Sequence, residues 1–99
     1  MLLKLGVSIE KLNRNIRRAL PIIEAVFVGV TGNETVITST YEGNHSLRSL
    51  HYANDAVDIR LPKKREEVSE IIDKLKVALG KNYDVVISTF CIHIEWDPK

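Results

Sequence analysis

Three side chains in this sequence are of the types that hold a catalytic metal ion. His51 and Asp58 are separated by six residues, and His93 lies in an apolar run near the C-terminus. Two imidazoles and one carboxylate form the ligand set of an open zinc site, which leaves one coordination position for water. If these side chains meet in space, the metal that they hold could activate that water for hydrolysis.

Each of these residues also has a simpler interpretation, and the spacing alone does not decide between them. His51 could be an ordinary loop histidine, and His93 could be a hydrogen-bonded or exposed histidine on a strand. Asp58 could pair with Arg60 or with a lysine. Cys91 could add a thiolate ligand to the metal, or it could be a small buried hydrophobic residue.

The hydrophobic pattern predicts the elements that must position these residues. Apolar residues at helical spacing predict a helix from about residue 9, which Pro21 should kink or restart before the apolar run 22–30. A β-branched run predicts a strand over 35–40. Residues 41–54 are expected to form a long loop, and this loop contains two of the three histidines.

The second half of the chain has a more regular pattern. It predicts a strand over 56–61, an amphipathic helix over 65–79, and a hairpin of strands over 83–88 and 91–96. These elements predict an α+β fold in which helices pack on one face of a small antiparallel sheet, with residues 1–99 forming one domain.

Alternation along the last strand separates its polar and apolar side chains. One face is expected to carry Cys91, His93 and Glu95, and the other Ile92, Ile94 and Trp96. The polar face could be solvent-exposed, or it could be the floor of a site.

The composition excludes several classes of function. The 99 residues carry a formal net charge of +1, which predicts no nucleic-acid partner because phosphate binding needs clustered positive charge. A single cysteine allows no intramolecular disulfide. No uncharged run is as long as a membrane span, and the first residues lack the basic region and cleavage site of a signal peptide. We expect a monomer with no membrane partner.

The segment Ser49–Asp58 resembles the S-x-H-x-x-G-x-A-x-D signature of the zinc D,D-peptidase family. This family includes D-alanyl-D-alanine carboxypeptidases, dipeptidases and phage endolysins. Ser49, His51, Ala56 and Asp58 are in register with the signature. The ending Ile92–Pro98 is similar to the segment that carries the last ligand of the family. The resemblance covers roughly residues 38–98 and is closest to small phage-encoded members.

The resemblance implies the Hedgehog/D,D-peptidase fold, with zinc held by His51, Asp58 and His93. It implies hydrolysis of peptidoglycan peptides that have a D-residue near the cut. We then expect Ser49 to support the ligand loop and Glu95 to be the general base. A phage-encoded protein of this kind would stay in the cytoplasm until lysis or be associated with the virion.

Other side chains could bind the substrate or take alternative roles. Arg48 and Arg60 could bind a peptide carboxylate, because a guanidinium pairs with it in a fork, or they could form salt bridges within the fold. His45 could contact the substrate or support the loop. Glu95 could also support a ligand instead of taking a proton, or could be a surface carboxylate.

The sequence departs from the family pattern at two places. Asn54 replaces the family glycine, and asparagine tolerates a positive φ better than most residues. Family members place a catalytic acid three residues before the last ligand or a histidine two residues before it, where this chain has Phe90 and Cys91. Two alternatives therefore remain: a zinc domain with impaired catalysis that binds peptidoglycan or serves a phage structure, and an α+β interaction domain without a metal.

Overall fold

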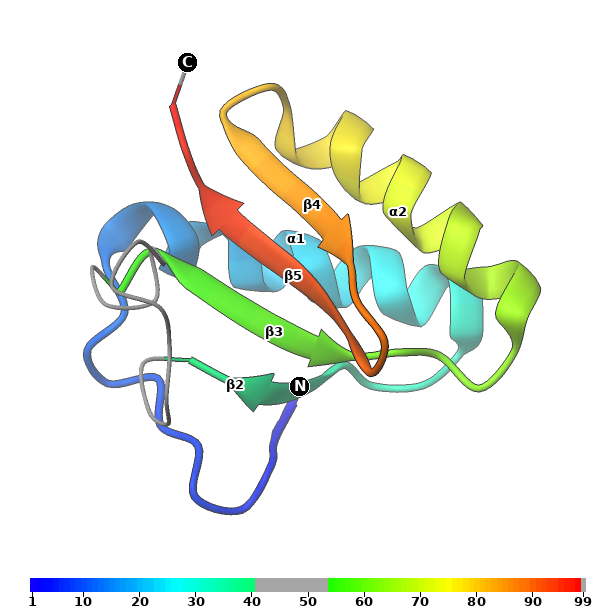
Figure 1. Ribbon diagram of the computed structural model, residues 1–99, viewed down its shortest axis with the longest axis horizontal. Helices are drawn as coiled ribbons and strands as arrows, with labels where there is room; N and C mark the ends of the chain where they lie inside the picture. The colour runs from blue at the N-terminus through cyan, green and yellow to red at the C-terminus, as the bar shows by residue number, and fades with distance from the viewer. Residues whose placement is uncertain (41–53, 99) are drawn as a thin grey trace.

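Two helices cover one face of a five-stranded sheet (Figure 1). The structure is a computed structural model that describes residues 1–40 and 54–98. The strands lie in the order β1-β2-β3-β5-β4, so that β5 is flanked by β3 and β4. The described elements are β1 (Leu2–Leu3), α1 (Arg14–Thr31), β2 (Val36–Ser39), β3 (Ala56–Arg60), α2 (Arg65–Leu79), β4 (Tyr83–Ile87) and β5 (Cys91–Trp96).

The sheet is mixed, which corrects the prediction of an antiparallel sheet at one edge. The pairs β2–β3, β3–β5 and β4–β5 are antiparallel, as predicted. β1, however, pairs with β2 in parallel, through the Leu2 N–H that donates to Thr35 O and the Lys4 N–H that donates to Ile37 O. A strand of two residues is too short to show alternation, so the hydrophobic pattern did not predict it.

Helix α1 begins later than the hydrophobic spacing predicts and continues through its proline. Ile9 and Leu12 contribute to the core from a turn in which the Leu12 N–H donates to Ile9 O, and the helix begins at Arg14. Pro21 lies on the exposed side, and the helix runs unbroken past it to Thr31. Proline in a helix interior costs about 3 kcal/mol, which burial of the opposite face offsets.

The core lies between the helices and one face of the sheet. In α2, whose predicted bounds are confirmed, Ile71 and Leu75 are fully buried. Large apolar residues that are fully buried also alternate along the central strands: Val57 and Ile59 in β3, Ile92 and Ile94 in β5. The small Ala56 at the start of β3 is fully buried as well. The side chains between the large apolar residues therefore face away from the helices. This face, which the helices leave uncovered and which we call the open face, carries Asp58 and His93, two of the predicted metal ligands.

Candidate metal centre

Asp58 and His93 meet on the open face of the sheet. They are directly opposite each other in the antiparallel ladder between β3 and β5. An Oδ1 atom of Asp58 lies 2.7 Å from Nδ1 of His93, and the two side chains are 17% and 23% exposed. The structure thus brings two of the three predicted ligands together. The third, His51, lies outside the described residues, as do His45, Arg48 and Ser49.

Glu95 contacts the other side of the same imidazole. It is two residues after His93 on β5, and alternation places it on the same face, as predicted. Its Oε1 atom lies 2.6 Å from Nε2 of His93. Two carboxylates, at Nδ1 and at Nε2, therefore fix the plane and the direction of the ring.

The carboxylates also favour the protonated ring. The hydrogen bond with Asp58 is the largest effect and raises the pKa of His93 above its usual value. Partial burial opposes this shift, and the hydrogen bond with Glu95 and the charges of both carboxylates add to it. Because a neutral imidazole has only one N–H, only the charged ring can donate to both carboxylates at once.

The two facing atoms, Oδ1 of Asp58 and Nδ1 of His93, are of the types that bind zinc, and a zinc ion could replace the proton between them. A tetrahedral zinc would hold a histidine nitrogen and a carboxylate oxygen roughly 3.3 Å apart. The present separation is 2.7 Å, so the two atoms would move apart by only a fraction of an ångström. Nε2 would then carry the ring proton and donate it to Glu95, which is the usual arrangement behind a metal-bound histidine.

The position of Glu95 favours this supporting role over the predicted role of general base. Its carboxylate lies across the ring from Asp58. A general base must come within roughly 2.6–3.2 Å of the group that gives up the proton, or reach it through one water. Asp58 and Nδ1 of His93 would hold the metal, and Glu95 contacts Nε2, where it is placed to orient the ring.

Two further acids lie beside Glu95. Single carboxylate oxygens of Asp84, Glu95 and Asp97 lie within 4.8 Å of one another. Asp84 is opposite Glu95 in the β4–β5 ladder, and the Asp97 N–H donates to Asn82 O. No motif in the sequence singles out Asp84, although the register of the predicted hairpin places it next to Glu95.

The chain that leads into β3 is held at three points. Asn54 has a φ of 61°, a left-handed backbone conformation that asparagine tolerates better than most residues. The Asn13 N–H donates to Asn54 O, and Nδ2 of Asn13 donates to Oδ1 of Asp55, each at 2.9 Å. The Trp96 N–H donates to Asp55 O at 2.8 Å. Residues 54 and 55 are thereby fixed between the start of α1 and the end of β5.

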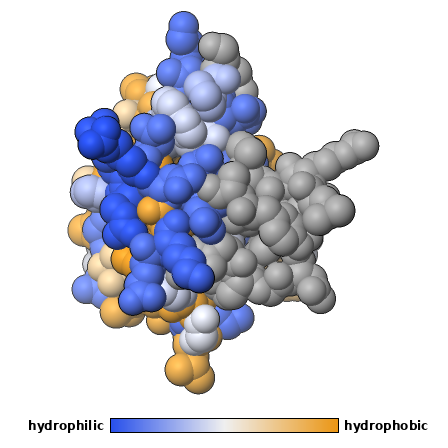
Figure 2. All heavy atoms as spheres, turned by 90° about the vertical axis from the view of Figure 1, so that its left-hand side faces the viewer, coloured by the Kyte–Doolittle hydropathy of each residue, from blue (hydrophilic) through white to orange (hydrophobic). Residues whose placement is uncertain are grey.

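This anchoring uses a side chain that would otherwise cap a helix. Asn13 is the N-cap residue of α1, yet its side chain makes no capping hydrogen bond. A good cap contributes about 1 kcal/mol to helix stability. The hydrogen bond from Asn13 to Asp55 therefore replaces a capping hydrogen bond that would stabilise α1. Figure 2 looks onto this end of the molecule and shows that most of the described surface here is hydrophilic.

Cys91 and Phe90 offer no acid or base to the centre. Sγ of Cys91 lies 3.0 Å from Oγ of Ser88. Burial raises the pKa of the Cys91 thiol, and the charge of Asp58 raises it further, so the thiol stays neutral. The side chain of Phe90 is 84% exposed in the turn between β4 and β5. Among the described residues, Cys91 completes no group of three metal donors with Asp58 and His93.

Comparisons of the chain with protein-family models, with curated proteins and with solved structures found no match. In the described part of the chain, no helix is both long enough and apolar enough to cross a membrane.

Proposed function

We propose that this protein is a zinc-dependent peptidase that hydrolyses peptidoglycan peptides, with His51, Asp58 and His93 as the metal ligands. The observation that supports it is the pairing of Asp58 with Nδ1 of His93 across β3 and β5, with Glu95 at Nε2. A metal-bound histidine usually donates its other ring N–H to a carboxylate, and Glu95 is placed to accept it from Nε2 of His93. The specific Hedgehog/D,D-peptidase fold is part of this proposal.

Each residue has a defined task in the proposed centre. Asp58 and His93 supply one oxygen and one nitrogen ligand, and Glu95 is a positioning residue that keeps the Nε2 proton and the ring plane in place. When bound, the metal would polarise the scissile carbonyl and lower the pKa of its water. Ser49 would support the ligand segment, and His45 and Arg48 would bind the substrate, as the sequence resemblance implies.

The substrate class and the setting come from the sequence resemblance. The substrate is a cell-wall peptide with D-alanine or another D-residue near the scissile bond. The enzyme would act after release at lysis or as part of a virion. It would work without a nucleic-acid partner.

One set of observations favours a second candidate, a zinc domain that binds peptidoglycan with little catalysis. Glu95 contacts Nε2 of His93, whereas Asp58 contacts Nδ1 on the other side of the ring. The two positions where the family has its acid or second histidine hold Phe90 and Cys91, and the Cys91 thiol is neutral. In this candidate the metal and the open face remain, and only turnover is lost.

The test is release of D-alanine from purified muropeptides by the zinc-loaded protein. The peptidase proposal predicts release that stops with a chelator, returns with zinc and is lost in His93→Ala. Binding of muropeptides without release, with zinc retained, would favour the second candidate. Neither release nor binding by the zinc-loaded protein would contradict both.

A further inference from the structure

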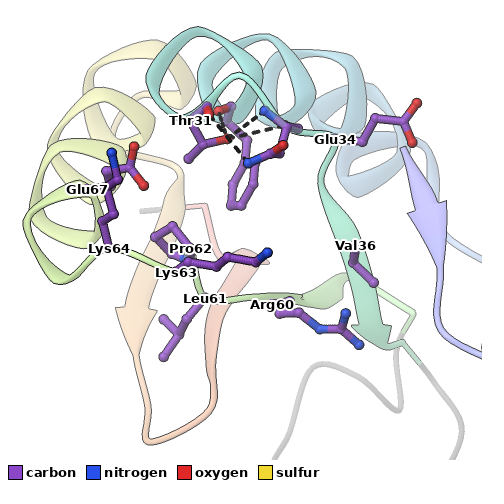
Figure 3. Close-up of a pocket in the computed structure, with 11 residues that line it drawn as sticks. Thr31, Glu34, Val36, Arg60, Leu61, Pro62, Lys63, Lys64 and Glu67 are labelled. Carbon is purple, nitrogen blue, oxygen red and sulfur yellow. Dashed lines mark hydrogen bonds between the residues drawn. The ribbon is translucent and has the colours of Figure 1, made fainter.

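A cavity of about 370 Å³ lies at the end of the two layers, and neither Asp58 nor His93 lines it. Figure 3 shows its position between the last turn of α1, the start of α2, strand β2 and the chain that joins β3 to α2. Its volume is at the lower end of the range for small-molecule sites, roughly 300–1,000 Å³. It therefore has room for a single residue of a peptide or a molecule of that size.

Apolar side chains form much of the cavity wall. Phe27 is 5% exposed, and Val36, Leu61 and Pro62 are partly buried around the cavity. The rim at the end of α1 is held by local hydrogen bonds, in which Oγ1 of Thr31 donates to Phe27 O at 2.8 Å. An apolar wall with a fixed rim favours an aliphatic or aromatic group over a purely polar ligand.

The charges at the mouth of the cavity favour an anion. Arg60, Lys63 and Lys64 line it together with Glu34 and Glu67. Figure 3 shows the ammonium of Lys63 extending toward the middle, whereas the carboxylate of Glu34 points away from it. Lys64 and Glu67 carry opposite charges and offset each other. No ion pair links Arg60 or Lys63 to any other described residue.

We propose that this cavity binds the C-terminal residue of a peptide, with its carboxylate at Lys63 and Arg60 and an apolar side chain against Phe27 and Leu61. Charge-assisted hydrogen bonds to a carboxylate are among the stronger polar contacts. The apolar wall adds hydrophobic burial that a free inorganic anion lacks. None of Asp58, His93 and Glu95 lines the cavity, so this proposal can be tested separately from the peptidase proposal.

The experiment is a titration of the ¹⁵N-labelled full chain with N-acetyl-leucine, followed by NMR. Two matched probes accompany it: N-acetyl-leucinamide, which lacks the carboxylate, and N-acetylglycine, which lacks the apolar side chain. We expect saturable shifts at the amides of Val36, Leu61 and Glu67 with a dissociation constant on the order of 1 mM, and weaker binding of both other probes. The same shifts in Asp58→Ala exclude the metal centre as the site.

Charge variants decide which residues hold the carboxylate. Lys63→Gln and Arg60→Gln should each weaken the binding of N-acetyl-leucine about threefold to fivefold, as expected for an exposed charge pair. Glu67→Gln should tighten the binding of N-acetyl-leucine, because it removes a negative charge from the cavity. Lys81 does not line the cavity, so Lys81→Gln should leave the binding unchanged. Equal binding of the acid and the amide, or binding that Lys63→Gln and Arg60→Gln leave unchanged, would overturn the proposal.

Discussion

The two faces of the β3–β5 ladder have the same register but opposite chemistry. On the helix side, Ile59 pairs with Ile92 and Val57 with Ile94, and all four are fully buried. On the open side, Asp58 pairs with His93 and both remain partly exposed. A period of two lets neighbouring residues of one strand serve the core and the site separately. Substitutions on the helix side should therefore unfold the protein, whereas those on the open side should change metal binding.

The largest effect is expected on the apolar face. Ile94→Ala removes a fully buried side chain at the centre of the sheet. It should lower the free energy of unfolding by about 2–5 kcal/mol, because burial is lost and a cavity is left. Urea denaturation of the metal-free protein measures this. A loss below about 1 kcal/mol would contradict the comparison of the two faces, because the side chains on the helix side would then contribute little to the stability of the fold.

The next effect concerns Glu95 on the open face. Glu95→Ala should weaken zinc binding by roughly 10–100-fold, because the Nε2 proton of His93 loses its acceptor. Glu95→Gln should weaken it less, since the amide oxygen can still accept that proton. A competition titration with a chromophoric chelator measures both affinities.

Asp84→Asn is the matched control for Glu95, because Asp84 lies opposite Glu95 in the β4–β5 ladder and is not one of the proposed ligands. It should bind zinc nearly as well as the wild type. If Glu95→Gln keeps its zinc but loses all hydrolysis, Glu95 is the general base predicted from the sequence, and the positioning role is wrong.

A smaller effect is expected at the anchor of residues 54 and 55. Asn13→Ala removes the hydrogen bond to Asp55 and should lower the free energy of unfolding by about 1 kcal/mol. Zinc affinity should fall as well, although Asn13 does not contact the proposed ligands. Arg14→Ala is a control one residue away. Equal zinc affinity in Asn13→Ala and in the wild type would show that the anchor serves stability alone.

The smallest effect is the pH dependence of the metal-free protein. The pKa of His93 is raised in the folded state, chiefly by Asp58, so protonation of the ring favours folding. This contribution is fully present below the ordinary histidine pKa of about 6.5, and is lost as the pH rises through the raised value. The difference in unfolding free energy between the wild type and His93→Gln should therefore shrink on going from acid to alkaline pH. A difference that grows instead would contradict the pairing.

Most of the fold could be predicted because its elements have clear periodicity. Helix α2 and the β4–β5 hairpin lie close to where the apolar pattern places them. The start of α1 could not be predicted, because Ile9 and Leu12 have helical spacing although they reach the core from a turn. Apolar residues at helical spacing indicate that one side of a segment is buried. A turn can be buried in this way as well as a helix, so the spacing alone does not locate the first residue of the helix.

The candidate site could be predicted in part. Motif and alternation indicated Asp58, His93 and Glu95, and the structure places Asp58 and Glu95 in contact with the two ring nitrogens of His93. The direction of the Glu95 carboxylate depends on side-chain geometry that a sequence does not specify. The contacts of Asn13 with Asn54 and Asp55 join segments about 40 residues apart, which no local pattern can reveal.

The most direct test of the central claim is the zinc content of the purified protein, measured by elemental mass spectrometry. Wild type, Asp58→Ala, His93→Ala and Asp84→Asn are compared after identical purification with zinc. The pairing of Asp58 with His93 predicts about one zinc per chain in wild type and Asp84→Asn, and its loss in Asp58→Ala and His93→Ala. Zinc that persists in His93→Ala, or that is lost only in Asp84→Asn, would contradict the assignment of the metal to this pair.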